Sequence, residues 1–234
     1  MNPTSNLNPS ALDQDELKTM VGQAALKFVV KGALVGVGTG STVNKFIDAL
    51  ASIKNEITGV VSSSQASTDR LLALGFRVFD ANEVEDIPVY IDGADELDTK
   101  GYMIKGGGGA LTREKIIAAQ ARKFVCIVDE SKFVQQLGQF PLPLEVIPMA
   151  SKRIIREFLK IGGQANLRQK DGKPFVTDNG HNIVDVSGLK IRNPRSFETQ
   201  VSQWPGVLTV GVFAFEKANV GLISSSSGIK ELKF

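Results

Sequence analysis

The sequence of 234 residues has very little of the residues that build disulfide frameworks and metal centres, with one cysteine and one histidine. The single Cys126 excludes a disulfide within the chain. Its place in the apolar run KFVCIVDE predicts a buried strand thiol in a reducing compartment. The single His181 lies in the turn-like segment DNGHN, which predicts a surface turn residue. A histidine-rich metal site is therefore excluded, and a Ser-His-Asp triad has only this one candidate base.

Long apolar runs and blocks of like charge are also missing. No stretch reaches the roughly 18 apolar residues of a membrane span, and the opening segment MNPTSNLNPSALDQ lacks the basic and apolar regions of a signal peptide. The 27 lysines and arginines nearly balance the 25 acidic residues, so we expect no nucleic-acid or membrane partner. The composition predicts a globular cytoplasmic protein with a mobile polar tail over residues 1–14.

The first part of the chain alternates between strand-like and helix-like patterns. Apolar residues recur at helical spacing over residues 15–30. Short apolar runs that stop at glycine, serine or aspartate then alternate with amphipathic segments. The strand-like runs cover residues 33–38, 56–64, 87–96 and 123–129, and the helical segments cover 41–54, 65–75 and 111–122. This order predicts a doubly wound, mostly parallel Rossmann-like sheet, whose ligand crevice lies at the carboxyl ends of its strands.

The pattern changes in FPLPLEVIP, where three prolines fall within residues 141–148. The elements that follow are a strand (144–148), a helix (151–161), two strands (164–168 and 175–186), a helix (195–203) and a strand (207–215). This βαββαβ order predicts a small ferredoxin-like α+β domain over residues 141–215. The last apolar run, within residues 216–234, is expected to return to the first sheet, so residues 15–140 and 216–234 form the predicted catalytic domain.

The segment GVGTGST, residues 36–42, lies between a predicted strand and a predicted helix. Backbone N–H groups at such a helix start, beside the hydroxyls of Ser41 and Thr42, suit a phosphate group. A dinucleotide fingerprint would need glycine in place of Ser41, and a P-loop would need a lysine before the hydroxyl residue. The alternatives that remain are a general anion-binding turn and a purely structural tight turn.

The segment IDGADELD, residues 91–98, brings four acidic residues to the predicted end of a strand. Its spacing does not fit a calcium-binding loop. Acidic residues in a loop are usually solvated, but strand ends are where this architecture places its chemistry. Both a functional and a purely solvated role therefore stay open for Asp92, Asp95, Glu96 and Asp98.

The segment IKGGGGALTREK, residues 104–115, is the most informative. Lys105 is expected to end a short strand, and the four glycines would let backbone N–H groups approach a ligand. Glu114 would lie in the first turns of the following helix. Fixed N–H donors and an ammonium group can stabilise a developing oxyanion, and a nearby carboxylate can move a proton. The alternative is a linker with Glu114 placed to favour the helix dipole.

Six ordered motifs give the sequence a specific resemblance. GVGTGST, SSSQAS, DGADE, KGGGGALTREK, DESK and FPLPLEVIPMA cover nearly the whole chain after the tail, and together they resemble the ribose-5-phosphate isomerase family of the A type. The resemblance implies interconversion of ribose 5-phosphate and ribulose 5-phosphate in the non-oxidative pentose phosphate pathway, without a metal or organic cofactor. It also implies a homodimer or homotetramer.

The resemblance implies roles for individual residues at the matching positions. Glu114 would move a proton between C1 and C2, while Asp92, Asp95 and Lys105 would contact the sugar hydroxyls and assist ring opening and charge stabilisation. Lys132 would bind the phosphate, and Lys18 is a weaker candidate for the same task. The other implied substrate contacts are Thr39, Gly40, Ser41, Thr42, Gly93, Ala94, Gly106, Gly107 and Gly108.

Two other classes of protein stay open at this point. A sugar-phosphate deaminase or a coenzyme A transferase could use a related scaffold, and a transferase would use its glutamate as a nucleophile. A non-catalytic sugar-phosphate sensor is the second alternative. Glu114 alone does not separate a proton shuttle from a nucleophile, but the neighbouring DGADE and KGGGG motifs favour the shuttle.

Overall fold

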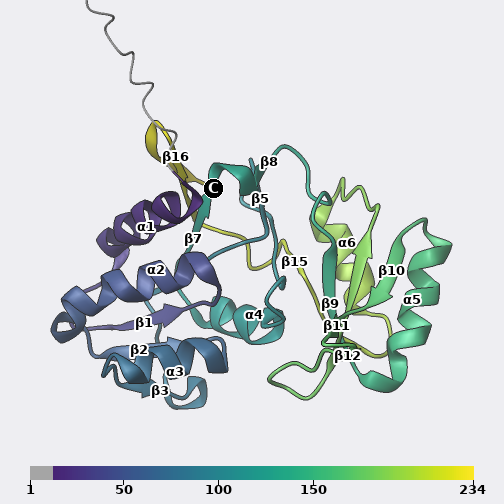
Figure 1. The fold of residues 1–234 in the computed structure, drawn as a ribbon, viewed down its shortest axis with the longest axis horizontal. Helices are drawn as coiled ribbons and strands as arrows, with labels where there is room; N and C mark the ends of the chain where they lie inside the picture. The colour runs from purple at the N-terminus through teal and green to yellow at the C-terminus, as the bar shows by residue number, and fades with distance from the viewer. Residues whose placement is uncertain (1–12) are drawn as a thin grey trace, which may run out of the picture.

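The computed structural model describes residues 13–234, which form a larger and a smaller lobe (Figure 1). Most of the predicted tail, residues 1–12, lies outside this range. Helix α1 (Gln14–Ala25) begins one residue earlier than expected. Asp13 and Glu16 form a capping box at its start, in which each side chain accepts the backbone N–H of the other residue, and this satisfies two helix-end donors.

The larger lobe contains a seven-stranded sheet with the strand order β17-β16-β7-β4-β1-β2-β3. All neighbours are parallel except β16 and β17. This confirms the mostly parallel sheet, and it confirms that the end of the chain returns to it. The strands are β1 (Leu34–Val37), β2 (Gly59–Ser62), β3 (Val78–Phe79), β4 (Val89–Asp92), β7 (Phe124–Asp129), β16 (Val220–Ser225) and β17 (Gly228–Lys233).

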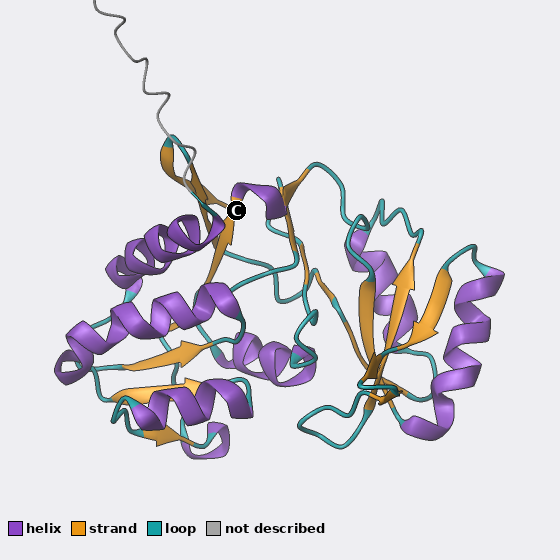
Figure 2. Ribbon diagram, in the orientation of Figure 1, coloured by secondary structure: helices purple, strands orange, loops and turns teal. Residues whose placement is uncertain are grey.

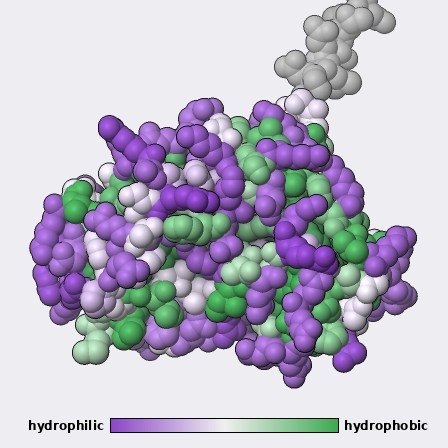
Figure 3. All heavy atoms as spheres, turned by 180° about the vertical axis from the view of Figure 1, so that it is seen from behind, coloured by the Kyte–Doolittle hydropathy of each residue, from purple (hydrophilic) through white to green (hydrophobic). Residues whose placement is uncertain are grey.

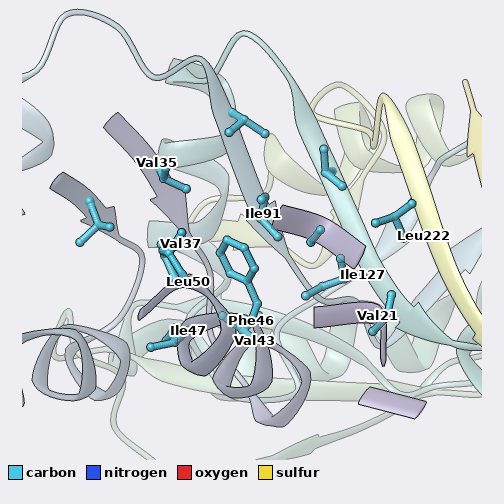
Figure 4. Close-up of a cluster of buried hydrophobic side chains, with 14 of the residues drawn as sticks. Val21, Val35, Val37, Val43, Phe46, Ile47, Leu50, Ile91, Ile127 and Leu222 are labelled. Atoms are coloured by element: carbon cyan, nitrogen blue, oxygen red, sulfur yellow. The ribbon is translucent and has the colours of Figure 1, made fainter. Parts of the chain in front are cut away.

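Helices cover both faces of this sheet (Figure 2). Residues of α1, of α2 (Ser41–Leu50) and of α3 (Gln65–Ala73) belong to one hydrophobic cluster, whose α1 and α2 members pack against the strands in Figure 4. Residues of α4 (Leu111–Gln120) belong to a cluster on the other face. In β7, Val125 and Ile127 join the first cluster, and Phe124 and Cys126 join the second. A strand covered on both faces is apolar throughout, as KFVCIVD is.

The smaller lobe follows the predicted βαββαβ order. Its antiparallel sheet has the strand order β10-β13-β9-β14. The elements are β9 (Leu142–Val146), α5 (Ser151–Lys160), β10 (Gln164–Leu167), β13 (Asn182–Ser187), α6 (Pro194–Ser202) and β14 (Val207–Val210), with a hairpin of β11 (Gln169–Lys170) and β12 (Lys173–Pro174). The predicted strand 175–186 is wrong in its first half, because Asp178, Asn179 and Gly180 form a turn and Gly180 has a φ of +79°.

A third sheet lies between the two lobes, and the sequence analysis did not predict it. Its order is β15-β6-β5-β8, and the strands are β5 (Glu96–Asp98), β6 (Met103–Ile104), β8 (Phe133–Val134) and β15 (Val212–Phe213). The predicted strand 207–215 is therefore two strands, β14 and β15, in different sheets. They separate at Gly211, where a Cβ atom would lie 2.5 Å from the carbonyl oxygen of Lys105.

Five short 3₁₀ turns complete the described structure: Leu26–Phe28, Ala51–Glu56, Ala81–Glu83, Glu130–Lys132 and Pro148–Ala150. Within residues 13–234, every helix is too short or too polar to cross a bilayer. On the face opposite to that of Figure 1, hydrophilic and hydrophobic residues are interspersed (Figure 3).

Candidate active site

A cavity of about 320 Å³ lies at the carboxyl ends of β1 and β4, beside the start of α4. This is the edge at which a parallel sheet with helices on both faces places its ligands. Every predicted site residue except Asp92 lines this cavity. The lining residues are Gln14, Lys18, Thr39, Gly40, Ser41, Thr42, Gly93, Ala94, Asp95, Lys105, Gly106, Gly107, Gly108, Glu114, Val128, Asp129 and Lys132.

The turn between β1 and α2 forms one wall of the cavity. Gly40 has a φ of +107°, a conformation that favours glycine, and α2 begins at the next residue. A Cβ atom on Gly38 would lie 1.9 Å from the Asp92 carboxylate, so only glycine fits there. The Thr39 N–H donates to Asp92 at 3.1 Å. The start of α2 therefore faces the cavity, where its N–H groups and its dipole favour an anion.

Lys105, Asp92 and Glu114 form a buried group of charges at the base of the cavity. The exposed fractions of their side chains are 3%, 0% and 4%. Lys105 Nζ lies 2.8 Å from Asp92 Oδ2 and donates to the Gly93 carbonyl oxygen at 2.5 Å. The same nitrogen lies 3.3 Å from Glu114 Oε2, but the two atoms are not aligned as a hydrogen bond. Glu114 Oε2 is therefore a buried oxygen without a hydrogen-bond partner in residues 13–234.

The surroundings of Glu114 make it an unusually strong base for a carboxylate. Burial is the main cause that raises the pKa of Glu114 to about 8. The negative charges of Asp92 and Asp95 raise this pKa further, whereas the positive charge of Lys105 lowers it. Burial alone would lower the pKa of Lys105, but Asp92 and Glu114 outweigh burial and hold this pKa above its usual value. One cation thus lies between two carboxyl groups.

Asp92 differs from the expectation that it touches a ligand directly, because it is fully buried. Its Oδ1 accepts the N–H groups of Thr39 and Gly93, and its Oδ2 accepts Tyr90 Oη at 2.5 Å as well as Lys105. These donors saturate the carboxylate. In this structure Asp92 therefore acts on the cavity through Lys105, which it holds in place.

The glycine run lies over Asp95, which lines the cavity as predicted. The Gly107 N–H donates to Asp95 Oδ2 at 2.7 Å, and a Cβ atom on Gly107 would lie 2.4 Å from Asp95 Oδ1. Burial raises the pKa of Asp95, although the Gly107 N–H and the Lys105 charge oppose this shift. Bare backbone is thus needed here, because a side chain would displace the carboxylate.

Two other members of the predicted acidic cluster lie outside the cavity. Glu96 accepts backbone N–H groups of Gly138 and Phe140, and Asp98 accepts those of Lys100 and Tyr102. These carboxylates stabilise the third sheet and its loops. Across the described range 13–234, no group of three or more His, Cys, Asp or Glu side chains could hold a metal ion.

The two predicted phosphate lysines, Lys18 of α1 and Lys132, both line the cavity. Lys132 follows Asp129, which ends β7 and accepts the Ser131 N–H at 3.0 Å. The sequence analysis did not select three lining residues: Gln14, Val128 and Asp129. The location of Val128 and Asp129 at the end of the strand KFVCIVD was the available signal, whereas Gln14 has no distinctive pattern.

Two residues with predicted structural roles stand outside the cavity. Cys126 is a buried free thiol in β7, as expected. His181 is more than a surface turn residue, because its Nδ1 lies 3.2 Å from Oε1 of Glu145, a fully buried residue of β9. Glu145 also binds Thr112 of α4, so this polar cluster ties the smaller lobe to the helix that carries Glu114.

These features define a class of protein: an α/β enzyme with a site for a small anionic ligand and one buried carboxylate beside fixed donors. The family model of ribose 5-phosphate isomerase A (phosphoriboisomerase A) matches residues 59–228. The chain belongs to this family.

Individual relatives are similar to this chain over 95% or more of its length. Ribose-5-phosphate isomerase A of Polaromonas sp. is 65% identical, with 99% of this chain and 98% of the relative covered. The crystal structure of ribose 5 phosphate isomerase A from Neisseria gonorrhoeae has a TM-score of 0.91 and 43% identity, and it covers 95% of this chain and 98% of its own. A D-ribose-5-phosphate isomerase in complex with phospho-erythronic acid has a TM-score of 0.90 and 35% identity, and it covers 95% of this chain and 100% of its own.

Proposed function

We propose that this chain interconverts D-ribose 5-phosphate and D-ribulose 5-phosphate by proton transfer through an enediolate, with Glu114 as the only proton shuttle. Ribose-5-phosphate isomerase activity, within the pentose phosphate pathway, is the activity of its family. The observation that carries the mechanism is the buried Oε2 atom of Glu114 at the cavity wall, which pairs with the Lys105 charge at 3.3 Å but accepts no hydrogen bond from residues 13–234. A buried polar atom without a partner is costly unless a ligand or a reaction uses it.

The chemistry requires one base and one set of fixed donors. Glu114 would remove the C2 proton of the open-chain aldose and return it to C1, while the proton of the C2 hydroxyl passes to the oxygen on C1. A single well-placed carboxylate can make both transfers on one face of the intermediate. Lys105 Nζ and the N–H groups of the glycine run would stabilise the negative oxygen.

The other lining residues would orient the substrate. The start of α2, with Thr39 to Thr42, and the ammonium group of Lys132 would hold the phosphate, with Lys18 as a further cation. Asp95 would accept a sugar hydroxyl, and Asp92 would fix Lys105. The strand order of the smaller lobe supports a ferredoxin-like domain over residues 141–215, and we further propose that the protein assembles as a homo-oligomer.

The test is incubation with ribose 5-phosphate in heavy water, followed by NMR. We expect ribulose 5-phosphate to form, with deuterium at C1 of the ketose and at C2 of the remaining aldose. Failure to form ketose would contradict the proposed activity. Ketose formation with a covalent glutamyl adduct, trapped by hydroxylamine, would instead contradict the role of Glu114 as a proton shuttle.

A further inference from the structure

One arginine of the smaller lobe reaches the glycine run of the larger lobe. Arg168, between β10 and β11, donates from Nη1 to the carbonyl oxygens of Gly106 at 3.1 Å and Gly107 at 2.9 Å. Its other two nitrogens bind Asp185 of β13, with Nε to Oδ2 at 2.8 Å and Nη2 to Oδ1 at 2.6 Å. The fork geometry of a guanidinium group allows both sets of bonds at once.

These contacts help to set the direction of two successive peptide groups: the Gly106 carbonyl also accepts the Gly109 N–H at 2.9 Å, whereas Arg168 is the partner of the Gly107 carbonyl. In a planar trans peptide the C=O and N–H bonds point in opposite directions. Because both carbonyls turn toward Arg168, the N–H groups of Gly107 and Gly108 turn away from it. The Gly107 N–H meets Asp95. The Gly108 N–H donates to no group in residues 13–234, and Gly108 lines the cavity, so this N–H is available to a ligand.

A neighbouring aromatic ring supports the same segment. A Cβ atom on Gly109 would lie 2.5 Å from the Phe175 ring, and Gly109 has a φ of +81°. The Arg168 guanidinium carbon lies 5.7 Å from the centre of the same ring. The Phe175 N–H also donates to the Arg168 carbonyl oxygen at 2.9 Å. Arg168 and Phe175 therefore form one platform under the glycine run.

We propose that Arg168 is a positioning residue for the isomerase site, which aims the Gly107 and Gly108 N–H groups at Asp95 and at the reacting sugar oxygens by binding two glycine carbonyls. The smaller lobe thereby completes the active site of the larger one. This inference rests on the proposed function. The proposed effect of Arg168 depends on the planar guanidinium group, which binds Asp185 and the two glycine carbonyls at once, and not on the positive charge alone.

The experiment compares Arg168→Ala, Arg168→Lys and a matched control, Arg153→Ala. Arg153 of the smaller lobe also donates to a backbone carbonyl, that of Pro205, but Pro205 does not line the cavity, whereas Gly106 and Gly107 do. We measure kcat and KM for ribose 5-phosphate, together with the melting temperature. We expect Arg168→Ala to lower kcat about 10- to 100-fold, as small misplacements of catalytic groups do. KM should change less than about threefold, because the phosphate end of the cavity is intact.

The lysine variant separates shape from charge. It keeps the positive charge but lacks the fork that binds Asp185 and both carbonyls, so we expect it to stay at least about fivefold below wild-type kcat. Equal kcat values for Arg168→Ala and Arg153→Ala would overturn the proposal, and so would full activity of Arg168→Lys. Should Arg168→Ala fail to fold, Arg168→Lys and Asp185→Asn carry the same test. An inactive wild type would instead refute the proposed function itself.

Discussion

Replacing Glu114 by glutamine keeps the shape of the side chain and removes its ability to accept a proton. General base catalysis contributes about 10²- to 10⁴-fold to a rate, and Glu114 is the only base that the mechanism uses. We therefore expect Glu114→Gln to lower kcat about 10³-fold, which corresponds to about 4 kcal/mol of activation free energy. KM should stay within about threefold of its original value, since the phosphate-binding residues are unchanged.

The assay is ketose formation from ribose 5-phosphate, with Glu96→Gln as the matched control. Glu96 is also a buried glutamate near the site, but it binds backbone N–H groups of a loop and does not line the cavity. We expect Glu96→Gln to keep kcat within about threefold of wild type once folding is verified. A Glu114→Gln variant within tenfold of wild-type kcat would refute the proton-shuttle role.

The same substitution has a second consequence, for stability. The folded-state pKa of Glu114, about 8, lies above its ordinary value of 4.5, so the folded protein loses stability as the pH rises from 4.5 to 8. Glutamine removes this loss. At about 1.4 kcal/mol per pKa unit, the upper limit for the gain in unfolding free energy of Glu114→Gln at high pH is about 5 kcal/mol. We expect a gain of about 2 kcal/mol, because the variant also removes a charge that pairs with Lys105. Denaturant unfolding at pH 5 and pH 9 measures the effect, and a wild type that loses no more stability than the variant between these two pH values would refute the raised pKa.

The remaining predictions concern pH, phosphate, the glycine run and metal ions. For the wild type, kcat/KM should rise with pH and level off above about pH 8, because the free enzyme needs ionised Glu114; a profile that is flat from pH 6 to pH 9 would contradict this. Lys132→Ala should raise KM for ribose 5-phosphate much more than KM for ribose, and an equal rise for both would remove Lys132 from the phosphate site. Gly107→Ala should lower kcat/KM at least about tenfold by displacing Asp95, whereas Gly108→Ala, whose Cβ meets only Thr39 at 4.0 Å, should have a smaller effect; equal losses would contradict the steric argument. Exhaustive chelation should leave the rate unchanged, and a rate that only an added divalent ion restores would refute a metal-free mechanism.

The parts of the fold that the sequence could predict are those with a strong local signal. KFVCIVD is apolar throughout because both faces of β7 are covered, and glycine or aspartate ends the strands at the cavity edge. Of the third sheet, the sequence predicted only the short strand before Lys105, because the strands contain two or three residues, which is too short for any period. One of its pairs, β6 with β15, joins residues more than a hundred positions apart, and the Lys105 N–H donates to the Gly211 carbonyl oxygen beside it.

The candidate site also has parts that the sequence could predict and parts that it could not. Most of its lining came from motifs that follow a strand end in sequence; Gln14 and Lys18, in the first helix, are the exceptions. The burial of each side chain could not be predicted from these motifs. The segment IPVYID does not reveal which of its residues the turn between β1 and α2 will cover, so Asp92 was expected to contact a ligand. Arg168 lies in a segment without any motif, and only the folding of the smaller lobe against the glycine run brings it to the site.

The donors of Lys105 suit the proposed role of Glu114 as the base and of Asp92 as a residue that positions Lys105. An ammonium group has three N–H donors; two bind Asp92 and Gly93, which leaves one near Glu114. When negative charge develops on the sugar oxygen, that third donor would be drawn to it and away from the carboxylate. Glu114 would lose part of the charge that lowers its pKa at the moment when it must hold the transferred proton. Asp92 already accepts four donors, so its proposed role is to keep Lys105 in place.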